Sequence, residues 1–290
     1  MLRGVNEMIV HSGGKDGVSE FAEIAQTNAN VVRIVWTIVN GTAAELDRAI
    51  ANALAQKLIP MIELHDATGI FSRLGELVNH WTSSAMLAVI RKYEQSLLLN
   101  IGNEVGNGSV SNATFEAGYR DAITRLRSAG VRTPLVIDAA TWGQNIDQLQ
   151  AVGPALIAHD PDHNVLLSVH MWWTNGTAQR IRTELAQSVS ANLPLIVGEF
   201  AQHAVDECSM YPFDYRALMA EAQLQGIGWL AWSWGSVRNV DCANDAPFDM
   251  TTNGTFASLT GWGREVAVSD PNSIQNTSVR PYSIVNGQCR

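Results

Sequence analysis

Two glutamates in this sequence, Glu104 and Glu199, each come at the end of a short apolar run. A lone glutamate at such a place is more often a helix cap or a surface group. Two of them are harder to explain in that way. Together they could form a pair in which one carboxyl group is protonated while the other is ionised. Such a pair can protonate a leaving oxygen and attack the carbon that carries it, which is the chemistry of acetal hydrolysis.

The runs that end at these glutamates belong to a set of eight, each apolar, β-branched and bounded by turn residues, as expected for buried strands. The eight runs are 2–6, 31–36, 59–65, 97–103, 135–139, 165–171, 195–199 and 228–232. Amphipathic stretches with helical periodicity alternate with them, at 42–56, 114–129, 177–191, 213–225 and 257–268. No Gly-x-Gly-x-x-Gly follows the first run, so a dinucleotide-binding fold has no support. The pattern predicts an α/β fold, a single (β/α)8 TIM barrel over residues 1–268, followed by a polar C-terminal tail or linker at 269–290.

In such a barrel the active site lies at the carboxyl ends of the strands. The residues at those ends with polar or large aromatic side chains are Asn6, Arg33, His65, Asp66, Asn103, Glu104, Asp138, His170, Glu199, Trp232, Ser233 and Trp234. The two glutamates close the fourth and seventh runs, whose strands face each other across the barrel. We therefore expect both carboxyl groups in one cleft, at the separation of about 5–5.5 Å that lets one of them act as a nucleophile.

The composition limits the classes of partner. Of the 290 residues, 46% are hydrophobic and 16% charged, and the formal net charge is −9 with no basic run. This balance argues against binding to nucleic acid or to an anionic membrane surface, but not against a neutral polymer. No apolar stretch approaches the roughly 20 residues of a membrane-spanning helix.

Several segments resemble glycoside hydrolase family 5, and within it the bacterial endo-β-1,4-mannanase branch. They are 63–69, 99–104, 136–139, 142–144, 168–171, 194–200 and 230–234. The resemblance runs from about Arg3 to Val268, and the ordered set is far more specific than Gly198-Glu199-Phe200 alone.

The resemblance implies that Glu104 is the catalytic acid/base and Glu199 the nucleophile. Arg33 matches an arginine near the nucleophile, where a guanidinium would keep Glu199 ionised. The alternative for Arg33 is a salt bridge at the barrel mouth, unrelated to catalysis. Asn103 would bind the sugar 2-hydroxyl, a contact that strengthens in the transition state.

The resemblance also assigns residues that contact the sugar. His65 and His170 match histidines that line the cleft, where they contact sugar hydroxyls and the carboxylates. Trp232 matches a platform beneath the sugar at the cleavage point, and Trp142 would line a neighbouring subsite. Indole rings stack well on the apolar faces of sugars.

A metal site formed by His65, Asp66, His170 and His203 is the alternative reading of the histidines. The sequence shows no His-x-His or His-Glu-x-x-His pattern, so we expect neither a metal nor a cofactor.

Three features depart from the family pattern. Trp172 stands where a tyrosine usually hydrogen-bonds the nucleophile, and an indole can only donate. A glycine-rich loop at 105–108 replaces a proline after the acid/base, which we expect to be more mobile and to reshape the neighbouring subsites. The usual β-hairpin before the first strand is missing, which would leave the bottom of the barrel less covered.

Three cysteines occur, Cys208, Cys242 and Cys289, without a Cys-x-x-Cys pair, which excludes a zinc knuckle. Cys208 and Cys242 fall in loops after late strands, so we expect a disulfide between them; three free thiols are the alternative. We expect a monomer that acts outside the cell, secreted and with its signal peptide removed.

The residues and the resemblance together predict a retaining endo-β-1,4-mannanase that acts on mannan, glucomannan or galactomannan. The alternatives are an endo-β-1,4-glucanase of the same family and a non-catalytic carbohydrate-binding barrel, which would have lost a carboxylate. A Schiff-base aldolase is disfavoured because none of the three lysines, Lys15, Lys57 and Lys92, ends a strand.

Overall fold

The eight runs form one closed barrel of parallel strands in a computed structural model that describes residues 1–206, 209–235 and 248–286. The strands are β1 (Arg3–Glu7), β2 (Val31–Trp36), β3 (Ile59–Leu64), β4 (Leu98–Asn100), β5 (Leu135–Asp138), β6 (Val165–His170), β7 (Leu195–Glu199) and β10 (Gly228–Ala231). Their order around the barrel is β1-β10-β7-β6-β5-β4-β3-β2, so neighbours in sequence are neighbours in space. The prediction of a TIM barrel is confirmed.

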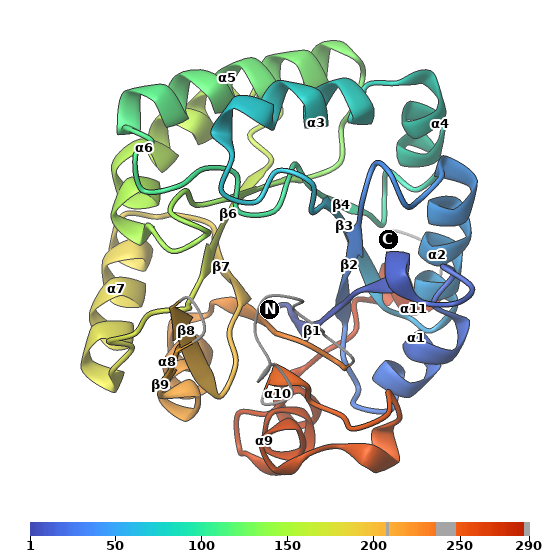
Figure 1. Cartoon of the computed structure of the whole chain (residues 1–290), viewed down its shortest axis with the longest axis vertical. Coiled ribbons are helices and arrows are strands. Elements are labelled where there is room, and N and C mark those ends of the chain that lie inside the picture. The colour runs from blue at the N-terminus through green and yellow to red at the C-terminus, as the bar shows by residue number, and fades with distance from the viewer. Residues whose placement is uncertain (207–208, 236–247, 287–290) are drawn as a thin grey trace.

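Helices surround this barrel, and their colour changes broadly from blue to orange around the ring in Figure 1. Those between the strands are α1 (Val18–Ala25), α2 (Ala43–Ala55), α3 (Leu74–Trp81), α4 (Ser84–Lys92), α5 (Asn112–Ser128), α6 (Ile146–His159), α7 (Ala178–Ser190) and α8 (Tyr215–Gln225). Side chains cap the N-termini of α2 and of α4 to α8, whereas α1 and α3 have no side-chain cap hydrogen bond. Thr42 accepts the backbone N–H of Glu45, whose side chain accepts that of Thr42 in return. Among the described residues, no helix is both long and apolar enough to cross a membrane.

Side chains inside the barrel form two layers of opposite character. The lower layer is an apolar plug of buried side chains from five strands, separate from the main core between strands and helices: Val31, Met61, Val136, Ile196 and Leu230. Because successive side chains of a strand alternate between its faces, the residue two places further on points inward again, nearer the carboxyl end. In four strands that residue is Arg33, Glu63, Asp138 or Trp232. Strand periodicity thus places a polar layer directly above the plug.

The end of the chain packs first on the outside of the barrel and then on its N-terminal end. Its elements are a 3-10 turn (Phe256–Ser258), α9 (Gly261–Arg264), a π turn (Glu265–Ser269), α10 (Ile274–Thr277) and α11 (Tyr282–Asn286). Trp262 of α9 contacts Tyr215 at the N-terminus of α8, whereas Thr277 of α10 contacts Arg3 of β1. The single helix expected at 257–268 is therefore broken, and Thr260 caps a new start by accepting the N–H of Gly263.

The segment after residue 268 was expected to be a polar tail or linker, but its described part packs against the barrel. Ile274 is fully buried, and Thr277 accepts a hydrogen bond from Arg3 Nε at 3.1 Å. Asn30 Nδ2 donates to the carbonyl of Val279, and Arg280 Nε to that of Ala29. Buried Ile274 and these satisfied backbone carbonyls explain the packing. They also cover the end of the barrel that the missing hairpin was expected to leave open.

A two-stranded antiparallel hairpin, β8 (His203–Asp206) and β9 (Ser209–Pro212), projects after β7 and was not predicted. Its strands are short and largely exposed, so they lack the apolar run that identifies a barrel strand.

Candidate active site

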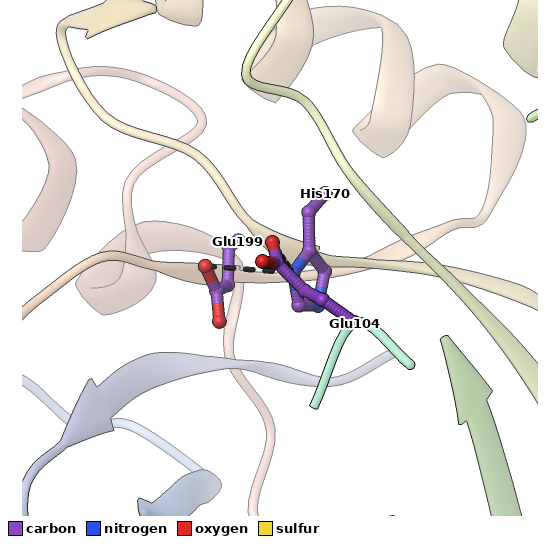
Figure 2. Close-up of side chains that lie close together, drawn as sticks. All are labelled: Glu104, His170 and Glu199. Carbon is purple, nitrogen blue, oxygen red and sulfur yellow. Dashed lines mark hydrogen bonds and ion pairs between the residues drawn. The ribbon is translucent and has the colours of Figure 1, made fainter. Parts of the chain in front are cut away.

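Glu104 and Glu199 converge on one cleft from the carboxyl ends of β4 and β7, as Figure 2 shows. His170 lies between them, with Nδ1 2.8 Å from Oε1 of Glu104 and 3.4 Å from Oε2 of Glu199. One side-chain atom of each of these three residues lies within 4.8 Å of the other two. The glutamates are 8% and 3% exposed. They therefore form a close pair, mostly shielded from solvent, as the sequence predicted.

Backbone geometry turns Glu104 into the cleft. The expected strand 97–103 ends early at Asn100, and Glu104 adopts a φ of +47°, in the left-handed region that non-glycine residues rarely use. Two backbone hydrogen bonds hold this conformation. The N–H of Glu104 donates to Oδ2 of Asp138 at 3.2 Å, and its carbonyl accepts the N–H of Gly69 at 2.9 Å.

Arg33 is the centre of the polar layer. Its guanidinium is fully buried and donates to Oε1 of Glu199 at 2.9 Å and to Oδ2 of Asp138 at 3.2 Å. Three side-chain amide oxygens accept its remaining hydrogen bonds, those of Asn6, Asn100 and Asn103. Arg33 thus contacts the nucleophile candidate and four of its neighbours at once.

These contacts shift the pKa of Glu199. Burial raises the pKa of Glu199 and the nearby charge of Glu104 raises it further, while His170 and Arg33 lower it; the net direction is upward. Arg33 therefore limits the rise without reversing it, so burial outweighs the expected effect of the guanidinium. Burial would lower the pKa of Arg33 itself, but the surrounding carboxylates, Glu63 first, raise it overall.

His170 is fully buried and is not among the residues that line the cleft. The ring makes the expected contacts with the two glutamates, but its burial leaves no exposed surface for the expected contact with sugar hydroxyls. Glycine backbone packs on it from two sides, since a Cβ at Gly143 or Gly198 would come within 2.7 Å of its atoms. Burial alone would lower the pKa of His170, but Glu199 and Asp138 raise it to about 10. A charged imidazolium therefore bridges the two catalytic candidates.

His65 forms a second histidine–carboxylate pair at the edge of the cleft. Its Nδ1 lies 2.9 Å from Oε1 of the buried Glu63, and its ring stacks on Trp232 with centroids 5.9 Å apart. Burial lowers the pKa of His65, and Glu63 raises it by more. Its side chain remains 25% exposed, so His65, unlike His170, can reach a bound molecule.

The cleft has a volume of about 640 Å³. The described residues that line it are Met8, His65, Thr68, Asn103, Glu104, Trp142, Gln144, Trp172, Glu199, Val205, Asp206, Trp232 and Phe248. Trp142 is 47% exposed and available for stacking, and its backbone N–H donates to the carbonyl of Gly106 in the glycine-rich loop. The amide of Asn103 is already bonded to Arg33 and Thr68 and is 1% exposed, so its contact with a sugar hydroxyl stays a prediction.

Trp172 occupies the place of the family's tyrosine and contacts the same partner. Its Nε1–H donates to Oε2 of Glu199 at 3.1 Å, and its ring meets Phe248 edge-on at 5.5 Å. Oε1 of Glu199 accepts from Arg33, so both carboxylate oxygens have a donor. The substitution keeps the hydrogen bond and changes the shape of the cleft wall.

Two other predictions have different outcomes. Of the residues considered as metal ligands, only His170 belongs to a cluster of possible donors among the described residues, and its partners are Glu104 and Glu199. The proposed disulfide between Cys208 and Cys242 lies outside the described residues, as does Cys289.

Sequence reasoning assigned no role to several residues of the site. Glu63 and Asp138 are fully buried carboxylates that hold Arg33 and the two histidines. Asp138 was predicted to end a strand, but without a role, and Glu63 was not singled out. The signal that places both in the site is the alternation of inward side chains, two places after Met61 and Val136. Asp206 lines the cleft from the hairpin that was not predicted.

Comparison with known proteins assigns this chain to a family. The family described as "Cellulase (glycosyl hydrolase family 5)" matches residues 5–237. The chain belongs to glycoside hydrolase family 5. This family 5 member is 36% identical to a mannan endo-1,4-beta-mannosidase of Cellvibrio japonicus over 99% of its own length and 66% of that protein's. It is 33% identical to a protein of the same name from Streptomyces lividans, over 96% and 72% of the two chains.

Solved structures agree with the sequence relatives. The mannohexaose complex of the Thermomonospora fusca β-mannanase superposes with a TM-score of 0.87 at 29% identity, covering 98% of this chain and 93% of that one. This family 5 chain spans slightly less than two thirds of the Cellvibrio protein.

Proposed function

We propose that this family 5 glycoside hydrolase is a retaining endo-β-1,4-mannanase that hydrolyses internal β-1,4-mannosidic bonds of mannan, glucomannan or galactomannan. The observation that carries the proposal is the pair Glu104 and Glu199, with side-chain oxygens within 4.8 Å of each other in one cleft. Carboxyl groups of retaining glycosidases lie about 5–5.5 Å apart, whereas inverting enzymes need about 6.5–9.5 Å to admit a water molecule. The spacing therefore favours retention.

In the first step of this mechanism a carboxylate oxygen of Glu199 attacks the anomeric carbon. The bond from that carbon to the glycosidic oxygen breaks, and Glu104 gives its proton to the departing oxygen. In the second step water attacks the same carbon, Glu104 takes a proton from the water, and the ester bond to Glu199 breaks. Both glutamates return to their starting states, and one glycosidic bond and one water molecule have been consumed.

The surroundings of the pair suit these steps. Arg33 and Trp172 donate to the two oxygens of Glu199 and orient it for attack. Trp232 and Trp142 provide flat apolar surfaces for sugar rings along the cleft. A non-catalytic binding barrel would keep the tryptophans without needing this closely spaced carboxylate pair.

The preference for mannan over glucan rests on the named relatives, which are mannan endo-1,4-beta-mannosidases. Release of products from plain mannan, galactomannan, glucomannan and soluble cellulose, measured side by side, tests it. We expect internal cleavage of the three mannans and little hydrolysis of cellulose. Faster hydrolysis of soluble cellulose would instead support the endoglucanase alternative, and no hydrolysis of any of the four would contradict an endo-acting enzyme on these polymers.

A further inference from the structure

Asp138 is a buried carboxylate for which the two-glutamate mechanism has no use. It ends β5, is fully buried and does not line the cleft, so it does not touch a bound sugar. Yet it lies within hydrogen-bond distance of the backbone of Glu104. A fully buried carboxylate is costly unless its surroundings hold it in place. Its contacts indicate what it does there.

Those contacts close a ring around the acid/base. Oδ2 of Asp138 accepts the backbone N–H of Glu104 at 3.2 Å and lies 3.5 Å from Nε2 of His170. The other ring nitrogen of His170, Nδ1, lies 2.8 Å from Oε1 of Glu104. Asp138 therefore holds Glu104 at both ends, directly at the backbone and through His170 at the carboxyl group.

Both ends need such support. Glu104 has a φ of +47°, and a residue in this region persists only when its surroundings fix it. Nε2 of His170 has no hydrogen-bond partner in the described part of the chain, so the charge of Asp138 at 3.5 Å is what faces it. Glycine positions hold the ring but provide no charge.

We propose that Asp138 is the positioning residue of the acid/base, acting on proton delivery to the leaving group through Glu104 and His170. This inference rests on the proposed function. Asp138 also accepts a hydrogen bond from Arg33 at 3.2 Å, and Arg33 holds Glu199. A role through the nucleophile is therefore the competing explanation that an experiment must separate.

The leaving group separates the two roles. When a sugar leaves, its oxygen takes the proton of Glu104 as the bond breaks. A 2,4-dinitrophenolate leaves as a stable anion and takes no proton, although Glu199 must attack in the same way. A defect in the acid/base therefore slows the first substrate only, whereas a defect in the nucleophile or in the fold slows both.

The experiment compares kcat/KM, which reports the first bond-breaking step, for mannopentaose and for 2,4-dinitrophenyl β-mannobioside. For Asp138→Asn we expect a loss of about 100-fold on mannopentaose and less than about 5-fold on the aryl substrate, since general acid catalysis contributes about 10²–10⁴-fold. Asp138→Ala also removes the acceptor for the N–H of Glu104, so its loss on mannopentaose relative to the aryl substrate should be larger. If the alanine variant does not fold, the asparagine variant still allows the losses on the two substrates to be compared.

Glu63→Gln is the matched control. Glu63 is an equally buried carboxylate of the same layer, 3.8 Å from Arg33, but its histidine partner is His65. We expect Glu63→Gln to slow both substrates by similar factors. Equal losses on both substrates for Asp138→Asn, or no loss on either, would overturn the inference.

The parent enzyme separates this inference from the proposed function. If it prefers cellopentaose and 2,4-dinitrophenyl β-cellobioside to the mannose substrates, the mannanase proposal fails. The kcat/KM losses of Asp138→Asn on cellopentaose and on 2,4-dinitrophenyl β-cellobioside, compared in the same way, still decide the role of Asp138.

Discussion

Arg33 and Arg127 are both buried guanidinium groups, and they lie at opposite ends of the barrel. Arg127, near the N-terminal end, forms two parallel hydrogen bonds of 2.8 Å with Asp160. The carbonyls of Val131 and Thr133 accept from its third nitrogen. Arg33, at the catalytic end, makes single contacts with five different side chains.

The difference separates stability from function. The two parallel hydrogen bonds to Asp160 and the two to backbone carbonyls use all three nitrogens of Arg127 and hold the end of α5 against the end of α6. At the catalytic end, three basic groups, Arg33 and two histidines, contact four carboxylates, those of Glu63, Glu104, Asp138 and Glu199. One carboxylate oxygen, Oε2 of Glu63, has no hydrogen-bond partner in the described part of the chain. Carboxylates in excess leave groups whose protonation can change during a reaction. We therefore expect substitutions at one end to affect folding and at the other to affect turnover.

The largest effect is expected from the glutamates themselves. Glu199→Gln and Glu104→Gln should each lower kcat on mannan by more than about 10³-fold, because the first removes the attacking carboxylate and the second removes the proton donor. The thermal unfolding midpoint should not fall, since the amide keeps the shape and removes a buried charge. Glu76→Gln, at an exposed glutamate paired with Arg73, is the control and should change neither quantity. Mannan cleavage by either catalytic variant at a near-parent rate would contradict the assignment.

The free energy of unfolding of Arg127→Met, measured by denaturant titration, should be about 3–5 kcal/mol lower than that of the parent, because Asp160 stays buried without its partner. Its kcat below the unfolding transition should equal that of the parent. Adding Asp160→Leu should restore much of the stability, since an apolar pair can replace an ionic one. A large loss of kcat in the folded Arg127→Met variant would break the division between the two ends.

The same pair predicts a dependence on pH. Burial raises the pKa of Asp160, but hydrogen bonds from Arg127 and from backbone N–H groups lower it by more, so the folded state has the lower value. The stabilisation is therefore complete above the unfolded pKa of about 3.9 and is lost as the pH falls through the folded value. The difference in free energy of unfolding between the parent and Arg127→Met should thus be largest at neutral pH and should decrease below about pH 4. A gap that is constant down to pH 2 would contradict this.

Arg33→Lys tests the catalytic end by the same logic. Lysine keeps the charge but cannot make five single contacts in the geometry of a guanidinium, so the groups it holds should shift. We expect kcat to fall about 100-fold, the effect of roughly 1 Å of misplacement, with a smaller change in unfolding free energy than in Arg127→Met. Arg127→Lys is the matched control, with parent kcat expected. Equal kcat values for the two lysine variants would show that Arg33 is only structural.

The smallest effect is expected at Trp172. Trp172→Phe removes the donor to Oε2 of Glu199, and a hydrogen bond to a charged group contributes about 1.5–3 kcal/mol, so kcat should fall about 10-fold or more. Trp172→Tyr restores a donor and should lose less. If the phenylalanine and tyrosine variants are equally active, the indole N–H has no part in orienting the nucleophile.

Strand periodicity made the barrel and the two glutamates predictable, because buried strands have a strong apolar signal and their carboxyl ends meet at one face. The contacts of Asp138 and Glu63 could not be predicted in this way. They depend on register between strands and on the left-handed turn at Glu104, which no local pattern specifies. The β8–β9 hairpin escaped prediction because its short, largely exposed strands lack an apolar run. The packed end of the chain escaped because tertiary contacts stabilise it, not local propensity.

Covalent trapping tests the central claim most directly. When the nucleophile attacks the anomeric carbon of a 2-deoxy-2-fluoro-β-mannobiosyl fluoride, fluoride ion leaves and an ester forms that is hydrolysed slowly. Peptide mass spectrometry then identifies the residue that carries this ester. We predict one added fluoromannobiosyl group per chain, on Glu199, and none in Glu199→Gln. A label on Glu104 or on another residue, or turnover of the reagent to a product of inverted configuration, would contradict the account.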